Sequence, residues 1–391
     1  MRGDTYRSPN NPAPHLVTHA SSLTRRLRGR IVDVMRTLVP VTRVRRHLVA
    51  VGALGLAALA ATPASSCTTV CLLEKDRAVV AYNYDFHAPD GLVLVNKRGT
   101  RKVSMVPSQA ATWTAVHGSV TFNQFGRDNP MTGLNEKGLM VSQMWLDETK
   151  YPAADSRPVV GILEWIQYNL DRHASVPEVL ANAEAVRPMS RFTIHYLVAD
   201  RSGDVATLEY LDGKLVVHHG AALPVRALTN STYADSVAAF EQARRAGNVP
   251  ASRSSLDRFV RAAVLAGAGQ ADPLGRGFEV LASVAQPNLT RWSIVYDLGA
   301  GEVHYRTDGN NAIRRITLAS LDFSCSTPVR MLDVTTGTTG DVSAAFEDYT
   351  TSGMRALIES TYSKTPILQP VPAAARDAIA VHPAATSSCS P

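Results

Sequence analysis

The residue with the clearest chemical potential is Cys67, which lies where a secretory leader would be cut. An apolar run over 48–61 follows a basic cluster, and Ala64 and Ser66 put small residues at the −3 and −1 positions that signal peptidase requires. Cleavage after Ser66 would make Cys67 the first residue of the mature chain. Its free α-amine, with a reference pKa of roughly 7.7–8.0, can accept a proton from its own thiol. The pattern predicts that maturation creates a cysteine nucleophile.

A cysteine at this place could also have a role without catalysis, and two such roles stay open. In lipoproteins the cysteine carries lipid on its sulfur and its amine, but that processing favours Leu at −3, where this chain has Ala64. A lipid-anchored chain would be a non-catalytic binding protein. Alternatively, Cys67 is a structural cysteine that stands near the leader by chance.

The basic excess of the chain is confined to the predicted leader, residues 1–66. The 391-residue chain has a formal net charge of +6, yet residues 1–66 hold ten Arg and two Asp, which leaves 30 basic and 32 acidic side chains elsewhere. A nearly neutral mature chain has no electrostatic footprint for nucleic acid or anionic membrane. Residues 1–34 are rich in Arg and make the predicted leader unusually long for a bacterial protein. Met35 starts a segment of ordinary leader length, so it is an alternative initiator.

We expect an exported protein, periplasmic or extracellular. No apolar run beyond the leader approaches the ~18–20 residues of a membrane span, so no stable membrane insertion is expected after cleavage. The four cysteines are too few for a disulfide scaffold, and whether Cys325 and Cys389 pair is left open. No C-x-x-C or H-E-x-x-H spacing occurs, so we expect neither a metal site nor a cofactor.

The elements that must position Cys67 come in blocks, without a regular βαβ alternation. Strand, turn and helix signals predict these elements in order: strands over 68–73, 78–84, 91–96, 102–106 and 139–145, helices from Ile162 and over 176–186, strands over 192–199, 205–211, 215–219 and 223–230, helices over 233–246, 255–266 and 278–285, and strands over 292–298, 302–307 and 314–318. Asp212-Gly213 predicts a type I′ hairpin.

Helices that are segregated from antiparallel strands predict a layered α+β domain, which we place over 67–362 as one catalytic domain. Residues 363–391 are rich in Pro and Ala and lose periodicity. We therefore expect a poorly ordered tail there.

Five motifs in a fixed order make the sequence resemble a known family. They are Cys67 at the mature start, Asn83-Tyr84-Asp85-Phe86, the hairpin 133–139, Leu228-Thr229-Asn230 and Arg258-Phe259-Val260-Arg261. Together they resemble the choloylglycine hydrolases, which include bile salt hydrolases and penicillin V acylases, from Cys67 to about Phe323. The resemblance implies a four-layer αββα sandwich of two antiparallel sheets covered by helices. It also implies cofactor-free hydrolysis of a small N-acyl amide, and a homotetramer.

The resemblance implies roles for four residues. Cys67 would be the nucleophile, Asp85 would hold its α-amino group, and Asn230 would be the oxyanion-hole amide. Arg258 would be a fixed cation that favours the thiolate. Without the resemblance, Asp85 and Asn230 would be interpreted as turn residues. Arg261 is expected to be a solvated arginine on the helix face.

Two departures from the family pattern concern substrate binding. Tyr82 stands where family members often have Arg, and Trp145 stands where they have Asn. A backbone N–H at Trp145 can still serve an oxyanion hole. The indole makes the site more apolar, which favours aromatic or fatty acyl groups. The sequence does not separate penicillin V, conjugated bile salts and N-acyl homoserine lactones, nor hydrolysis from acyl transfer to another amine.

Overall fold

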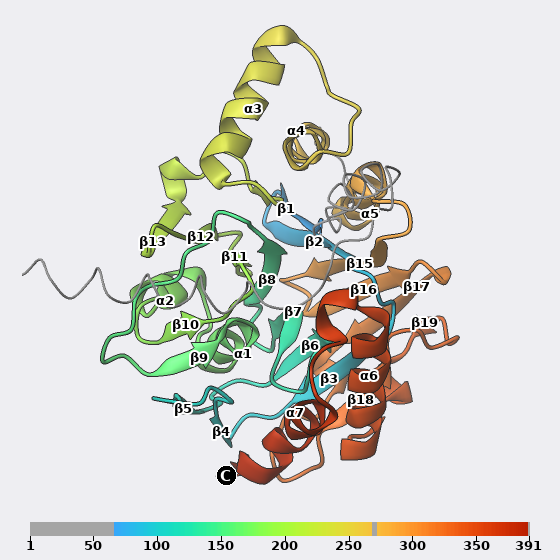
Figure 1. Cartoon of the computed structure of the whole chain (residues 1–391). Coiled ribbons are helices and arrows are strands. Elements are labelled where there is room, and N and C mark those ends of the chain that lie inside the picture. Colours follow the sequence, from blue (N-terminus) through green and yellow to red (C-terminus); the bar gives the residue numbers. More distant parts are fainter. Residues whose placement is uncertain (1–65, 268–271, 390–391) are drawn as a thin grey trace, which may run out of the picture. The chain divides into compact units, whose positions relative to one another are not determined.

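Two large sheets face each other in the computed structural model, which describes residues 66–267 and 272–389 (Figure 1). The predicted leader, apart from Ser66, lies outside these ranges. The first sheet has its strands in the order β14 (Ala227–Leu228), β1 (Thr68–Glu74), β2 (Arg77–Asp85), β15 (Thr290–Asp297), β16 (Glu302–Thr307), β17 (Asn310–Thr317) and β19 (Gly340–Asp341). All neighbours are antiparallel except β17 and β19.

The second sheet is antiparallel throughout. Its order is β13 (Lys214–His219), β12 (Val205–Leu211), β11 (Ile194–Ala199), β8 (Met140–Trp145), β7 (Pro130–Asn135), β6 (Ser119–Asn123), β3 (Leu92–Asn96), β18 (Arg330–Asp333) and β20 (Glu347–Asp348). Two small sheets add β9 (Val159–Gly161) with β10 (Arg187–Met189), and β21 (Ser388–Cys389) with β4 (Thr100–Val103) and β5 (Thr112–Thr114).

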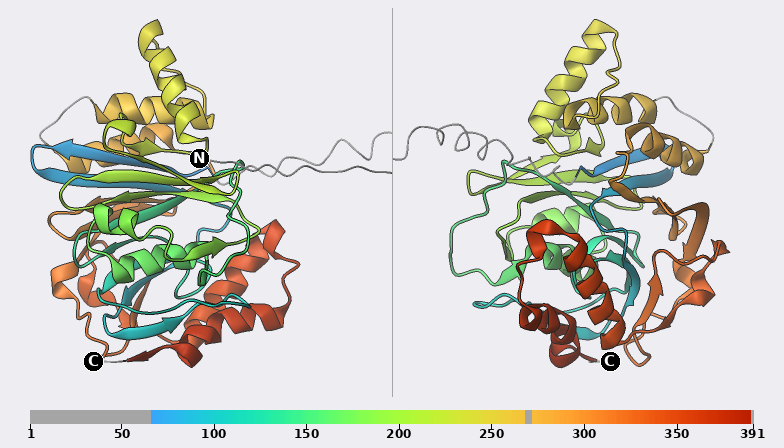
Figure 2. Two further views of the ribbon diagram at one scale, coloured as in Figure 1. Left: turned by 90° about the vertical axis from the view of Figure 1, so that its left-hand side faces the viewer. Right: turned by 45° about the vertical axis from the view of Figure 1, so that its right-hand side comes forward.

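Helices cover the outer faces of both sheets (Figure 2). On the first sheet lie α4 (Ser255–Ala266) and α5 (Pro273–Val284), with α3 (Tyr233–Ala246) packed on α4. On the second lie α1 (Ile162–Arg172), followed by α2 (Val176–Ala181), and α6 (Thr351–Lys364) with α7 (Ala373–Thr386). Short 3-10 turns are η1 (Gly220–Ala222), η2 (Leu318–Ser320), η3 (Ser343–Ala345) and η4 (Pro366–Leu368). The predicted αββα sandwich is therefore the observed fold.

The main core lies between the two sheets. Strand β3 shows why, because side chains alternate between its faces: Val93 and Val95 join the core between the sheets, whereas Leu94 packs outward against α6. Polar groups also join the layers, since the Tyr296 hydroxyl lies 3.1 Å from Thr132 Oγ1. Buried β-branched residues on alternate positions thus fix which face of each strand points inward.

Most local predictions hold within one or two residues. Asp212 and Gly213 have φ values of 50° and 78°, as a type I′ turn requires, and they join β12 to β13. The strand predicted over 223–230 is reduced to β14. Its first part is a loop because the Tyr233 hydroxyl bonds both the N–H and the carbonyl of Val225. None of the described helices is long and apolar enough to cross a bilayer.

The prediction of a poorly ordered tail over 363–391 was wrong for the residues described, which end at 389. This segment forms η4, α7 and β21, and a disulfide joins Cys325 to Cys389. The Ala-rich stretch that we interpreted as low complexity has high helix propensity. Leu368 and Ala380 are buried with α6, so the compact unit continues past residue 362 to the end of the described residues, and the predicted boundary at 362 is not seen there.

Candidate active site

Three neighbouring strands bring Cys67, Asp85 and Asn230 together, because each of these residues lies at or just beyond a strand end on the same side of the first sheet. Cys67 immediately precedes β1, and Asp85 ends β2, its antiparallel neighbour. On the other side of β1, Leu228 pairs with Thr69, so the chain that continues to Asn230 runs toward Cys67. Cys67 and Asp85 are fully buried. Residues far apart in sequence therefore meet because antiparallel pairing puts the start of one strand beside the ends of its neighbours.

Arg258 on α4 ties these segments together. Its Nη1 donates to the carbonyls of Ser66 and Cys67 at 2.7 and 2.8 Å and to Thr68 Oγ1 at 2.7 Å, while its Nη2 donates to Asn230 Oδ1 at 2.8 Å. Burial lowers the pKa of Arg258, but the neighbouring Asp85 and Cys67 act in the opposite direction. A guanidinium with these acceptors is a fixed cation at the start of β1.

The contact with Arg258 also sets the orientation of the Asn230 amide. An arginine only donates hydrogen bonds, so the oxygen of Asn230 must face it. The nitrogen is then turned the other way, and it donates to the carbonyl of Trp145 at 2.9 Å. The amide nitrogen of Asn230 thus lies on the side of β8, where the cavity described below begins.

Asp85 is a carboxylate in an environment that disfavours its charge. Burial raises its pKa to about 7, although a hydrogen bond from the Thr290 hydroxyl at 2.5 Å and the charge of Arg258 both lower it. In the uncleaved chain the nitrogen of Cys67 belongs to the peptide bond with Ser66. An α-ammonium released by cleavage at that bond would supply a cation near Asp85.

Tyr82 contacts the thiol instead of lining a substrate pocket. Its hydroxyl lies 3.7 Å from Cys67 Sγ and donates to the carbonyl of Gln143 at 3.2 Å. Burial raises the pKa of Tyr82 well above its usual value, so the side chain is a neutral phenol. Tyr82 therefore places an uncharged hydroxyl beside the sulfur.

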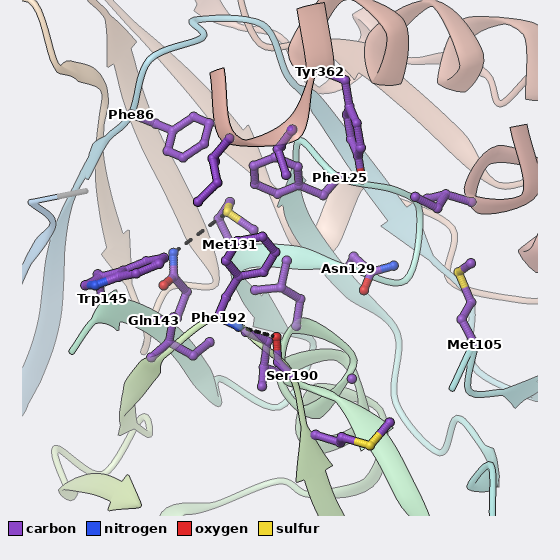
Figure 3. A pocket seen from close by; sticks show the side chains of 18 of the residues that line it. Phe86, Met105, Phe125, Asn129, Met131, Gln143, Trp145, Ser190, Phe192 and Tyr362 are labelled. Atoms are coloured by element: carbon purple, nitrogen blue, oxygen red, sulfur yellow. Dashed lines mark hydrogen bonds between the residues drawn. The ribbon is translucent and has the colours of Figure 1, made fainter. Parts of the chain in front are cut away.

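A cavity of about 300 Å³ lies directly beside this polar cluster (Figure 3). Trp145 and Gln143 line it, and their carbonyls accept the hydrogen bonds from Asn230 and Tyr82. Its wall is mostly apolar and includes Tyr84, Phe86, Met105, Phe125, Met131, Ile162, Leu163, Phe192, Ile194, Tyr362, Ile367, Leu368 and Ile379. Such a cavity suits an apolar group whose polar end faces Cys67.

Sequence reasoning missed Ser255, which contacts Thr229 and Asn230. Its Oγ accepts a hydrogen bond from the N–H of Asn230 at 2.8 Å and lies 3.0 Å from Thr229 Oγ1. The sequence offered a signal in the pair Ser254-Ser255 at the start of α4. Ser254 caps the helix by accepting from the Asp257 N–H, and Ser255 serves the neighbouring loop. Arg261 was expected to be a solvated arginine on the helix face, but it is half-buried and donates to the carbonyls of Pro250 and Ser252.

A second missed group is a buried pair, His195 on β11 and Glu209 on β12. The ring of His195 bonds Glu209 Oε1 at 2.9 Å and the carbonyl of Thr229 at 2.7 Å. Burial would raise the pKa of Glu209, yet hydrogen bonds from His195, His218 and the Tyr233 N–H hold it at about 2. The sequence predicted both strands, over 192–199 and 205–211, but not their pairing with each other, which brings these two residues together.

The described residues contain no group of three His, Cys, Asp or Glu side chains arranged to hold a metal ion. The structure brings Cys67, Asp85, Asn230 and Arg258 together, with Tyr82 against the thiol and Trp145 in the cavity wall. Their catalytic roles remain predictions.

Comparison with known proteins supports the resemblance. Residues 67–331 match the linear amide C–N hydrolases, choloylglycine hydrolase family. A penicillin V acylase from Pectobacterium atrosepticum is 35% identical over 177 residues, which cover 38% of this chain and 45% of that protein. The aligned part thus spans less than half of this relative's length.

Solved structures show the same fold. The penicillin V acylase from Agrobacterium tumefaciens superposes with a TM-score of 0.66 and 28% identity, covering 73% of this chain and 98% of that chain. A variant of the conjugated bile acid hydrolase from Clostridium perfringens superposes with a TM-score of 0.60, covering 70% of this chain and 98% of that chain. At 19% identity this similarity is evidence for the fold alone. The family match covers most of the chain, and this protein therefore belongs to the choloylglycine hydrolase family of linear amide C–N hydrolases.

Proposed function

We propose that this protein, once cleaved between Ser66 and Cys67, hydrolyses the amide bond of an N-acyl compound with Cys67 as its nucleophile. The observation that carries the proposal is the position of the apolar cavity, whose wall residues Gln143 and Trp145 bond directly to the residues around the thiol. Export, inferred from the leader pattern, is part of the same proposal. A homotetramer stays a prediction that light scattering of the purified protein would test.

The first half of the reaction forms a thioester. The free α-amine of Cys67 accepts the thiol proton, and the sulfur forms a bond to the acyl carbon. Asn230 donates to the oxyanion from its nitrogen side, and Asp85 stabilises the ammonium. The ammonium then passes its proton to the leaving amine as the C–N bond breaks.

The second half returns the enzyme to its starting state. Water gives a proton to the α-amine and its oxygen bonds the acyl carbon of the thioester. The C–S bond breaks, the ammonium returns its proton to the sulfur, and the carboxylic acid leaves the enzyme with a free thiol at Cys67. Arg258 keeps the start of β1 and the Asn230 amide in place through both halves.

The cavity indicates the class of acyl group. Its volume of about 300 Å³ is at the low end of the roughly 300–1,000 Å³ that small-molecule sites occupy. Aromatic rings from Phe86, Phe125 and Phe192 line it, and such rings pack well against another ring or a straight alkyl chain. We therefore infer a compact aromatic or unbranched aliphatic acyl group, as in penicillin V or a fatty acyl amide, in preference to a rigid steroid.

The test is a substrate panel with a matched pair of cysteine variants. Penicillin V, glycine-conjugated bile salts and N-acyl homoserine lactones are incubated with the processed protein and with Cys67→Ala and Cys71→Ala. Burial raises the pKa of Cys71 to about 12, so its thiol is inert and its loss leaves hydrolysis intact. Cys67→Ala is expected to abolish release of the amine. Equal hydrolysis by both variants would contradict the proposal.

A further inference from the structure

The cavity has a wall that the family match does not include. Tyr362 on α6, Ile367 and Leu368 on η4, and Ile379 on α7 all line it, yet the matched residues end at 331. In Figure 3 the Tyr362 side chain comes down from α6 beside Phe125, on the opposite side of the cavity from Trp145. We propose that the segment 351–389 sets the length of the acyl group that the enzyme accepts. This inference rests on the proposed function and specifies its substrate.

The beginning of this segment is fixed to the second sheet. Met354, Leu357 and Ile358 of α6 pack in one buried cluster with Leu94, which points outward from β3. Lys364, the last residue of α6, forms an ion pair with Asp90 at 2.7 Å. The helix that carries Tyr362 is therefore held against the body of the protein by apolar burial.

The end of the segment is fixed by three different contacts. His382 of α7 bonds the carbonyl of Val103 at 2.8 Å, β21 pairs with β4, and Cys389 is joined to Cys325. Between these anchors the side chain of Ile379 packs on Gly126, where a Cβ atom would lie 2.9 Å from it. A wall held at both ends keeps a fixed distance from Trp145, and a fixed distance limits the length of a bound chain.

The anchored wall contains both buried and exposed residues. An exposed residue can be replaced without disturbing the core, so such a variant tests the wall in a protein that still folds. Leu368 is buried, whereas Ile367 is 57% exposed although it lines the cavity, which places it at the opening. Replacing Ile367 by a larger residue therefore leaves the core unchanged. Ala378, next to Ile379 on α7, is exposed and does not line the cavity, so it offers a matched control.

The experiment measures kcat/KM for a series of linear N-acyl amides of one amine, from butanoyl to tetradecanoyl. Ile379→Ala is expected to extend the accepted length, with a gain of about fourfold for each further methylene that the cavity buries. Ile379→Phe and Ile367→Trp are expected to lower the rate for the longest substrates tenfold or more and to spare the shortest. Ala378→Phe should leave the profile unchanged. Identical profiles for wild type and Ile367→Trp would overturn the proposal.

Binding separates this inference from the proposed function. Calorimetry of the free carboxylic acids of the same series requires no catalysis. A length limit that moves with Ile379→Ala and Ile367→Trp supports the wall even in a protein that hydrolyses none of the amides. Hydrolysis with a length limit that no variant moves would keep the proposed function and reject the wall. The double variant Cys325→Ser/Cys389→Ser tests the disulfide, and we expect a broader length profile.

A different observation supports a second inference, about how the oxyanion residue is held. Both ring nitrogens of His195 face oxygen atoms that are placed to accept: Nδ1 faces Glu209, which also receives the Tyr233 N–H on the same oxygen, and Nε2 faces the carbonyl of Thr229. Each nitrogen must then carry a proton, because two acceptors cannot bond each other. We infer that both ring nitrogens of His195 donate a hydrogen bond in the folded protein, and that the ring positions the peptide that leads into Asn230.

The test combines a spectroscopic signature with kinetics. The ¹⁵N NMR spectrum at neutral pH is expected to show two protonated nitrogens for His195, which a neutral packing residue would not show. His195→Gln should lower kcat about tenfold with little change in KM, because the substrate binds elsewhere. The control is His219→Gln. His219 ends β13, and its ring bonds Asp204. A neutral ring, or an unchanged kcat in folded His195→Gln, would overturn the inference.

Discussion

The pKa values of two buried carboxylates, Asp85 and Glu209, are shifted in opposite directions. Burial raises the pKa of Asp85 to about 7, whereas hydrogen bonds from His195, His218 and the Tyr233 N–H hold that of Glu209 at about 2 against the same effect. Glu209 is compensated by groups that fold with it. Thr290 and Arg258 compensate Asp85 only in part, and the α-amine that leader removal exposes would add a further cation.

The difference between the two pKa values distinguishes a carboxylate that only positions other groups from one that is proposed to stabilise the reacting amine. A carboxylate that only positions other groups is stable when its charge is satisfied at once. A carboxylate that waits for a charge created by cleavage costs stability before that cleavage. If the proposed cleavage occurs, the uncleaved chain bears an electrostatic cost at Asp85 that the cleaved chain does not bear.

Asp85 is expected to have the greatest influence on stability. In the uncleaved chain the folded state binds a proton more tightly than the unfolded state, so the free energy of unfolding falls as pH rises from about 4 to 7. The shift of about three pKa units corresponds to about 4 kcal/mol. Asp85→Asn should remove this decline in a chain that begins at Thr62, as measured by urea unfolding at several pH values.

The mature protein is the control for that prediction. With the α-ammonium in place, wild type should show a much smaller decline, and Asp85→Asn should no longer stabilise it. Equal pH dependence in the cleaved and uncleaved chains would show that the amine and Asp85 do not interact.

The next effect is expected at Glu209 and has the opposite sign. Its folded-state pKa lies below the unfolded one, so its stabilisation is present above about pH 4.5 and is lost as pH falls toward 2. Glu209→Gln should destabilise the protein by about 3 kcal/mol at neutral pH, with the difference shrinking in acid. Thermal unfolding across this range measures it. A variant as stable as wild type at pH 7 would contradict the assignment.

The smallest change in stability is expected at Ser255. Removing its hydroxyl leaves the partly buried N–H of Asn230 without this acceptor, which costs about 1 kcal/mol, and we expect kcat of Ser255→Ala to fall about tenfold. Ser254→Ala removes the helix cap beside it and should cost about 1 kcal/mol of stability with no change in kcat. Steady-state kinetics of the two variants separates the roles, and equal kcat values would contradict them.

Strand alternation and helix spacing are local signals, and they predicted the layered fold. The residues that cluster at the start of β1 were assigned from the family resemblance, because alone Asp85 and Asn230 look like turn residues. The contacts that hold the site were not local. Thr290 reaches Asp85 from β15, and Ser255 reaches Asn230 from α4. The ordered C-terminal segment was missed for the same reason, since its helices depend on burial against Leu94 and Phe125 more than on their own periodicity.

The central claim is tested most directly by reading the N-terminus of the active protein. Purified, working enzyme is sequenced from its N-terminus, then mixed with a slowly hydrolysed amide, quenched in acid and digested for mass spectrometry. We predict a chain that starts at Cys67 with an unmodified amine and carries the acyl mass on the Cys67 sulfur. Full activity in a chain that starts at another residue, or with that amine blocked, would contradict the account.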